Sequence, residues 1–144
     1  AKGTGVDISQ KALKIAQINA NNLDVNDKLK LIKSDWFNKI SGKFDLIISN
    51  PPYIPSKQIK TLQTEVKDYE PMLALDGGEN GLDCYRQIAK QSSNFLNNNG
   101  YICLEVGQNQ YKDIIEIFRK QEFSVEFYKK DLANIERIIC FKKN

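Results

Sequence analysis

The chain has 144 residues, of which 41% are hydrophobic and 27% charged, and its net charge is +3. This length is enough for one domain with its own core, and the composition is ordinary for a soluble globular protein. The sequence contains no apolar run long enough to span a membrane and begins with no signal peptide. Its lysines form no basic stripe, which argues against a large nucleic-acid interface.

Histidine is absent, which removes the commonest general base and metal ligand. The three cysteines, Cys84, Cys103 and Cys140, are far apart in the sequence. Cys103 and Cys140 lie inside apolar runs. We therefore expect buried, reduced thiols in a cytoplasmic protein, and no metal site.

The first third of the chain predicts a strand, a helix and a second strand. Residues 2–6 are read as a strand that leads to Asp7. Ser9 is a suitable N-cap for a helix over residues 10–22. Residues 28–33 alternate around apolar side chains and predict a strand that ends shortly before Asp35. Each of the two strands is therefore followed by an acidic side chain.

A fully buried strand is predicted over residues 44–49, and it ends at Asn50-Pro51-Pro52-Tyr53. Two consecutive prolines end a strand, because proline lacks a backbone donor and its ring fixes φ. The residue before a proline is restricted to extended conformations. Asn50 is therefore held at the carboxyl end of a strand, where ligands bind in open α/β sheets.

These four residues predict a clamp for a planar group that carries NH2. The Asn50 side-chain oxygen and the Pro51 carbonyl are two fixed acceptors, and Tyr53 adds an aromatic face. Pro52 has no N–H, so it cannot draw the Pro51 carbonyl into a turn hydrogen bond. The alternative interpretation of the motif is a strand that ends in a proline-rich loop.

Residues 54–81 form a long irregular segment of the kind that often acts as a lid or binding loop, with room for a short helix around residues 56–64. An amphipathic helix is predicted over residues 82–96. Residues 97–100 are expected to close it, with Gly100 as the left-handed turn residue.

The last part of the chain predicts a strand over residues 101–106 and a helix over residues 108–121. Two strands follow at residues 123–128 and 137–141, and they are expected to pair antiparallel. Strands that alternate with helices of this length imply an α/β fold with a largely parallel sheet and crossover helices.

Eight stretches, the motif among them, share one pattern: Val6-Asp7-Ile8-Ser9, Ser34-Asp35-Trp36-Phe37, Asp45 to Pro55, Tyr69-Glu70-Pro71, Ala74 to Gly78, Gly81-Leu82-Asp83, Leu104 to Gly107, and Lys130-Asp131-Leu132 with Arg137. Together they resemble the HemK-type methyltransferases, which methylate the glutamine amide in peptide chain release factors. The resemblance covers nearly the whole chain, and the series that follows the motif favours the glutamine enzymes over the adenine enzymes.

The resemblance implies a Rossmann-like methyltransferase sheet of seven strands, mostly parallel with an antiparallel last strand. It implies S-adenosyl-L-methionine as cofactor, with Asp7 on the ribose hydroxyls and Asp35 and Trp36 beside the adenine. It assigns the catalytic and substrate-binding roles to Asn50, Pro51, Pro52 and Tyr53, and Asn50 would also contact the cofactor. From the residues alone, Asp7 is equally a helix-entry acid and Trp36 a core side chain.

The family has an earlier strand, a Gly-rich loop and a helical docking domain that this sequence lacks. Residues 1–144 are therefore expected to be an incomplete S-adenosylmethionine-dependent methyltransferase domain, truncated at its N-terminus. The missing strand belongs between the strand that ends at Asp7 and the strand that ends at Asn50.

The resemblance implies methyl transfer to the N5 amide nitrogen of a glutamine in a release factor, in the cytoplasm, without stable nucleic-acid binding or membrane association. Hydrogen bonds from the amide to Asn50 and to the Pro51 carbonyl would orient the nitrogen, so catalysis would rest on positioning and preorganisation. Two alternatives stay open. One is an adenine amino-methyltransferase acting on a flipped base of DNA or RNA. The other is a catalytically silent fragment or interaction domain.

Overall fold

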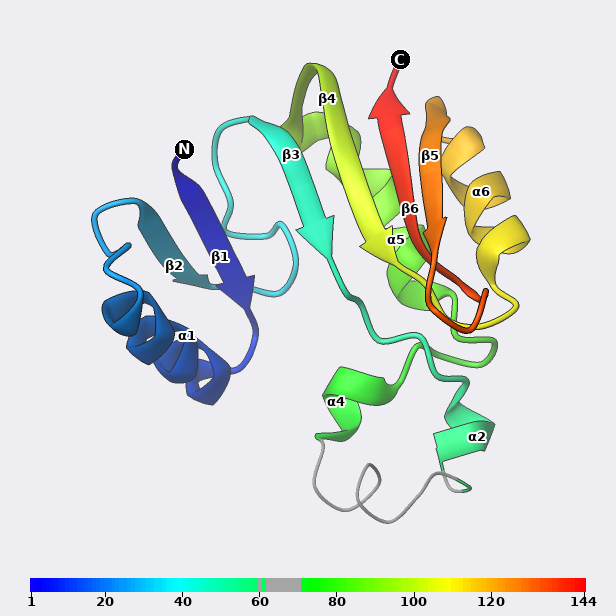
Figure 1. Ribbon diagram of the computed structural model, residues 1–144, viewed down its shortest axis with the longest axis horizontal. Helices are drawn as coiled ribbons and strands as arrows, with labels where there is room; N and C mark the ends of the chain where they lie inside the picture. The colour runs from blue at the N-terminus through cyan, green and yellow to red at the C-terminus, as the bar shows by residue number, and fades with distance from the viewer. Residues whose placement is uncertain (60, 62–70) are drawn as a thin grey trace. The chain divides into compact units, whose positions relative to one another are not determined.

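The computed structural model describes residues 1–59, 61 and 71–144 and has an α/β architecture. The chain forms two compact units, Ala1–Gly42 and Lys43–Asn144 (Figure 1). Among the described residues, no helix combines the length and the apolar character that crossing a membrane requires. Each unit has its own sheet, and the two are described in turn.

The first unit consists of β1 (Gly3–Asp7), α1 (Gln10–Asn22) and β2 (Leu29–Lys33). β1 and β2 pair in parallel, so α1 is the crossover helix between them. The Ser9 hydroxyl accepts a hydrogen bond from the Ala12 amide at 3.3 Å, which confirms the predicted N-cap. All three predicted elements are therefore present.

The second unit contains a four-stranded sheet in the order β3-β4-β6-β5. Its strands are β3 (Phe44–Ser49), β4 (Leu96–Glu105), β5 (Phe123–Lys130) and β6 (Glu136–Lys143). β3 and β4 are parallel, whereas β6 is antiparallel to both of its neighbours. The predicted antiparallel last strand is therefore confirmed.

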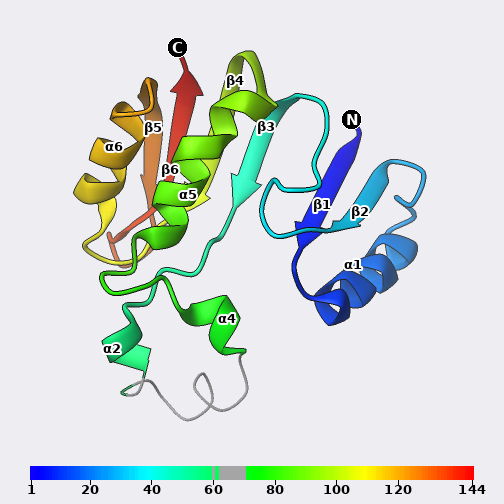
Figure 2. The same cartoon turned by 180° about the vertical axis from the view of Figure 1, so that it is seen from behind.

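Helices α5 (Asp83–Ser92) and α6 (Tyr111–Arg119) lie on one face of this sheet (Figures 1 and 2). A 3-10 turn, η1 (Ser93–Phe95), follows α5, and two short helices, α2 (Ser56–Ile59) and α4 (Met72–Leu75), flank the segment after the motif. The fully buried side chains between helices and sheet form the core; among them are Tyr85, Ile88, Ile102, Leu104, Ile114, Phe118, Ile139 and Phe141.

The other face of this sheet carries no helix of the second unit within the described residues (Figure 1). Side chains of β3, β5 and β6 stay exposed there, namely Leu46, Ile48, Phe127 and Ile138. The alternation along residues 123–128 predicts that Phe127 points inward with Phe123 and Val125. This prediction is wrong for Phe127, because the residue is 44% exposed. A β-bulge between Val125 and Phe127 shifts the register at this point.

The segment over residues 97–100 differs from the prediction. α5 ends at Ser92, and β4 already begins at Leu96, which pairs with Phe44. Asn99, not Gly100, has the left-handed φ of 61°, a conformation that asparagine tolerates. The side-chain Nδ2 of Asn97 donates to Asp45 Oδ1 at 2.7 Å, so a contact with β3 determines this segment.

Only part of the long segment after the motif can be compared with its prediction. α2 confirms the first turn of the short helix expected around residues 56–64. Residue 60 and residues 62–70, which include Tyr69 and Glu70, lie outside the described part of the chain.

Candidate functional site

The motif loop, residues 50–53, leaves the sheet at the carboxyl ends of two parallel strands. Ser49 is the last residue of β3 and pairs with Leu104 of β4, which ends at Glu105. β3 continues into the motif loop, and β4 continues into the turn Gly107–Gln110. Asn50 therefore has the predicted position at a strand end, where ligands bind in open α/β sheets.

Asn50 is exposed, whereas Pro51 is buried. Within the described residues, neither the Asn50 side chain nor the Pro51 carbonyl has a hydrogen-bond partner. The second proline explains this for the carbonyl, because Pro52 has no N–H to donate. Two acceptors at the strand end are therefore available to a ligand that donates two N–H groups.

Tyr53 is surrounded by three glycines, which we call the glycine socket: Gly77, Gly81 and Gly107. A Cβ at Gly77 would lie 2.8 Å from Tyr53 Cα, and one at Gly107 would lie 2.8 Å from Tyr53 Cδ2. Gly81 has a φ of 74°, and a Cβ there would overlap the Tyr53 carbonyl oxygen. Side chains at these positions would displace Tyr53, so the glycines permit close contact with the motif loop.

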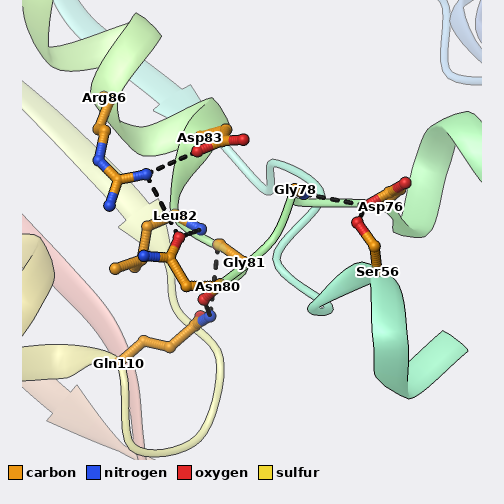
Figure 3. A network of polar contacts seen from close by, with 9 residues as sticks. All are labelled: Ser56, Asp76, Gly78, Asn80, Gly81, Leu82, Asp83, Arg86 and Gln110. Carbon is orange, nitrogen blue, oxygen red and sulfur yellow. Dashed lines mark hydrogen bonds and ion pairs between the residues drawn. The ribbon is translucent and has the colours of Figure 1, made fainter.

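The backbone after Tyr53 is hydrogen-bonded to residues 75–81, which we call the glycine-containing loop. The Ile54 amide donates to the Leu75 carbonyl at 3.0 Å, and the Gly77 amide donates to the Ile54 carbonyl at 2.9 Å. Asp76 Oδ1 accepts from the Ser56 hydroxyl at 2.7 Å and from the Gly78 amide at 2.9 Å (Figure 3). These two bonds, that of Ser56 foremost, lower the pKa of the Asp76 carboxyl.

The same loop is fixed to the start of α5. Arg86 donates through Nη1 to Asp83 Oδ1 at 2.6 Å and to Asn80 Oδ1 at 3.3 Å (Figure 3). The Leu82 amide also donates to Asn80 Oδ1, at 3.2 Å. The stretch that carries much of the family resemblance thus forms one connected turn around the motif loop.

The β5–β6 connection lies beside the end of β4. Asp131 accepts through Oδ1 from the amides of Ala133 and Ile135, at 2.8 and 3.0 Å, and through Oδ2 from Arg137 Nε at 2.9 Å. The Ile135 amide, followed by Arg137, lowers the pKa of the Asp131 carboxyl. The Arg137 carbonyl accepts from the Val106 amide at 2.9 Å, which attaches this turn next to Gly107.

Asp7, Asp35 and Trp36 belong to the first unit. Asp7 is the last residue of β1 and Asp35 follows β2, so both lie at the carboxyl edge of the parallel β1–β2 pair. Asp7 Oδ1 accepts from the Ser9 amide at 2.7 Å, as a helix-entry acid does. Trp36 is half-buried with a φ of 46°, an uncommon conformation for a bulky side chain. Because Asp7, Asp35 and Asn50 each follow an apolar strand of the predicted parallel sheet, the sequence predicts that they share one sheet edge, and this stays a prediction.

Sequence reasoning missed Gln110, whose side-chain Nε2 donates to the Tyr53 carbonyl at 2.9 Å. The two residues are separated by 57 positions in the sequence. Local patterns give no signal for such a contact, beyond the place of Gln110 shortly after the end of a buried strand.

A polar hollow of about 630 Å³ lies at the opposite end of the second unit's sheet, and its wall includes Lys43, Lys120 and Lys143. Lys143 donates to the carbonyls of Ser93 and Leu96, at 2.8 and 3.3 Å. This hollow is distant from the motif loop; Lys43 and Lys120 are exposed surface side chains, and the half-buried Lys143 makes a structural contact. We assign it no role.

Comparison with known families gives a direct result. A family model described as Eco57I restriction-modification methylase matches residues 6–141. The chain belongs to this methylase family. It is also 43% identical over 143 residues to the release factor glutamine methyltransferase of Agrobacterium fabrum, covering 99% of this chain and 50% of that protein. The enzyme of the same name from Caulobacter vibrioides is 41% identical over 145 residues, with 100% and 50% coverage.

These relatives confirm the resemblance that the motifs indicated, and the chain spans about half of their length. Among solved structures, a methyltransferase from Pyrococcus furiosus has a TM-score of 0.73 at 22% identity, covering 99% of this chain and 63% of that one. The magnesium protoporphyrin IX methyltransferase of Synechocystis PCC 6803, described with bound SAM, has a TM-score of 0.63 at 17% identity, with 100% and 60% coverage. These likenesses confirm the α/β methyltransferase fold.

Proposed function

We propose that the intact protein transfers a methyl group from S-adenosyl-L-methionine to the N5 amide nitrogen of a glutamine in a peptide chain release factor, in the cytoplasm. The observation that carries this proposal is the pair of unpartnered acceptors, on Asn50 and Pro51, beside the socketed Tyr53. The similar proteins named as release factor glutamine methyltransferases support the substrate.

An amide nitrogen is a poor nucleophile, because its lone pair is delocalised into the carbonyl. In the proposed complex, its two N–H groups donate to Asn50 Oδ1 and to the Pro51 carbonyl, which favours a pyramidal nitrogen with a directed lone pair. Tyr53 packs on the amide plane, and Pro52 keeps the loop stiff. These residues act by positioning and by preorganised electrostatics, and they require no strong base.

The residues of the first unit fit the adenosine half of the cofactor. The Ser9 amide orients the Asp7 carboxylate through Oδ1, which leaves Oδ2 to accept from the ribose hydroxyls. Asp35, which is exposed, and Trp36 supply a carboxylate for the exocyclic amine and a ring for the adenine. When bound, S-adenosylmethionine supplies the methyl group. Asn50 would contact both cofactor and substrate.

We also propose that the domain is completed by a further strand between β1 and β3, which gives seven strands, and by a Gly-rich loop. Among the described residues, β1 pairs only with β2 and β3 only with β4, so each has an open edge.

An adenine amino-methyltransferase acting on DNA or RNA is the second candidate, because adenine also presents a planar NH2. The restriction-modification name of the matched family model favours it. The experiment incubates the intact protein with labelled cofactor, release factor and adenine-containing DNA, and locates the label by mass spectrometry. We expect label on a glutamine side chain of the release factor. Label in the DNA and none in the release factor would reject the proposal.

The clamp itself is tested by Asn50→Ala in the intact protein. Removing one preorganised acceptor is expected to slow single-turnover methylation by on the order of a hundredfold or more, without lowering the melting temperature. Asn50→Asp keeps the size and one acceptor but adds a charge, and we expect it to be slow as well. Asn98→Ala, at an exposed position near the other end of the sheet, is the matched control. A near-normal rate with Asn50→Ala would mean that the motif is only a stiff loop.

A further inference from the structure

We propose that Gln110 is a positioning residue: its side-chain amide holds the Tyr53 carbonyl and thereby sets the place of the Tyr53 ring for methyl transfer. The catalytic part of this inference rests on the proposed function. The contact between the two residues does not, and it can be measured in a protein that methylates nothing.

The backbone of Gln110 is fixed from both sides. Its amide donates to the Gly107 carbonyl at 3.2 Å, and its carbonyl accepts from the Ile114 amide at 3.1 Å in the first turn of α6. The side chain therefore starts from a rigid point between the end of β4 and a packed helix. A rigid origin is what a side chain needs in order to position another group.

The Gln110 amide joins the motif loop to the glycine-containing loop. Its Nε2 donates to the Tyr53 carbonyl at 2.9 Å, and it lies 3.3 Å from the Gly81 carbonyl and 3.4 Å from the Asn80 carbonyl. Figure 3 shows this side chain reaching Asn80 and Gly81. All three partners are acceptors, so the site requires a donor, and a carboxylate would be repelled.

The other end of the same amide argues against a purely stabilising role. Gln110 Oε1 is buried and has no hydrogen-bond partner among the described residues. A buried acceptor without a partner is costly, and a leucine would avoid that cost. The Oε1 end of this amide lowers stability, whereas the Nε2 end makes all of its hydrogen bonds. Such a side chain is expected where the position of a neighbouring group matters more than stability.

Gly107 makes this arrangement possible. A Cβ at that position would overlap Gln110 Oε1 and would lie 2.8 Å from Tyr53 Cδ2. The Gln110 amide and the Tyr53 ring therefore both lie against the bare backbone of Gly107. Displacement of the amide opens space beside the ring, and the ring is the part of Tyr53 that is proposed to contact the substrate amide.

The first test measures methylation by the intact protein with Gln110→Leu. We expect kcat to fall by on the order of tenfold to a hundredfold, while the KM values change little, because the ring is misplaced and not removed. Gln121→Leu, an exposed position just beyond the other end of α6, is the matched control. If Gln110→Leu does not fold, Gln110→Met replaces it. A lower melting temperature with an unchanged kcat would reduce Gln110 to a structural residue and overturn the proposal.

The second test asks whether Gln110 acts through Tyr53. In a Tyr53→Ala background there is no ring to position, so adding Gln110→Leu is expected to change kcat by less than about twofold. If Gln110→Leu lowered kcat by the same factor in the Tyr53→Ala background as in the wild-type protein, the proposal would be overturned.

The third test separates this inference from the proposed function. Hydrogen exchange of side-chain amides in the 144-residue chain is expected to be slower for Gln110 than for Gln121. If the intact protein leaves release factor unmethylated while the Gln110 side-chain amide is protected, the proposed function is rejected and the contact is kept. Equal exchange at the two glutamines would reject the contact itself.

Discussion

The two compact units differ in how completely each buries its own apolar surface. In residues 1–42, all of which are described, the buried apolar side chains are Leu13 and Ala20. Ile15, Ile18 and Leu23 of the same unit are 58%, 52% and 72% exposed. The second unit holds a continuous core in which the rings of Phe118 and Phe141 are stacked, with their centroids 4.3 Å apart. A two-stranded sheet with one helix and so little core is not expected to be stable by itself.

The proposed site is divided in the same way. The proposed substrate clamp lies on the unit with a continuous core, whereas the proposed cofactor acids Asp7 and Asp35 lie on the unit with little core. Ligand binding to a weakly structured unit stabilises it by mass action. Cofactor affinity and the order of residues 1–42 are therefore expected to change together.

The largest expected effect concerns amide hydrogen exchange in the 144-residue chain. β1 and β2 are expected to exchange at nearly unprotected rates, because little core opposes their opening, whereas central β4 and β6 should exchange only on global unfolding. If a further strand pairs with β1 in the intact protein, as proposed, β1 should gain the most protection there. Equal protection of β1 and β4 in the 144-residue chain would contradict the comparison.

The second largest difference between the units is expected when a core side chain is truncated to alanine. Phe118→Ala removes a fully buried ring and should lower the free energy of unfolding of the second unit by about 3–5 kcal/mol. Leu13→Ala, the matched change in the first unit, should leave that transition within about 0.5 kcal/mol. Urea unfolding followed by circular dichroism measures both. A comparable loss from Leu13→Ala would show that the units unfold together.

The glycines give a smaller and more local test. Gly77→Ala brings a Cβ to 2.8 Å from Tyr53 Cα, a backbone atom that cannot move alone, and should cost about 1–3 kcal/mol. Gly3→Ala in β1 meets only a Leu29 methyl at 3.4 Å and should be neutral or slightly stabilising. Thermal melts compare the two. A neutral Gly77→Ala would argue that the socket does not constrain the motif loop.

The smallest effect is expected on acidification. The pKa of Asp131 is lowered in the fold by the Ile135 amide and by Arg137. Its contribution to stability is therefore present above the ordinary carboxyl pKa of about 3.9 and lost as the pH falls through the lowered value. Asp131→Asn should flatten the fall in melting temperature below about pH 4. Parallel curves for the two proteins would contradict this assignment.

The sequence predicted elements whose cause is local. The apolar run over residues 44–49 predicted β3, and Ser9 predicted the start of α1, because strand burial and helix capping depend on neighbouring residues. The same logic failed at residues 97–100, where three asparagines and a glycine resemble a helix exit. Pairing of Leu96 with Phe44 across the sheet decides that segment instead.

The candidate site divides along the same line. The position of Asn50 at the end of β3 was predictable, since two prolines stiffen the residues beside them. The glycine socket was recognisable only as a family signature. The reason for glycine at these positions is the close approach of Tyr53, which only the folded structure shows. Gln110 was not predictable, because its partners lie 29 to 57 positions away in the chain.

The left-handed Trp36 has a practical consequence, since it is the single tryptophan of the chain. All six tyrosines lie beyond residue 42, in the other unit. Emission excited at the red edge therefore originates in residues 1–42 alone, whereas the tyrosine signals originate in the other unit. The two units carry separate optical labels without any chemical modification, and an adenine stacked on Trp36 would register as quenching of only one of them.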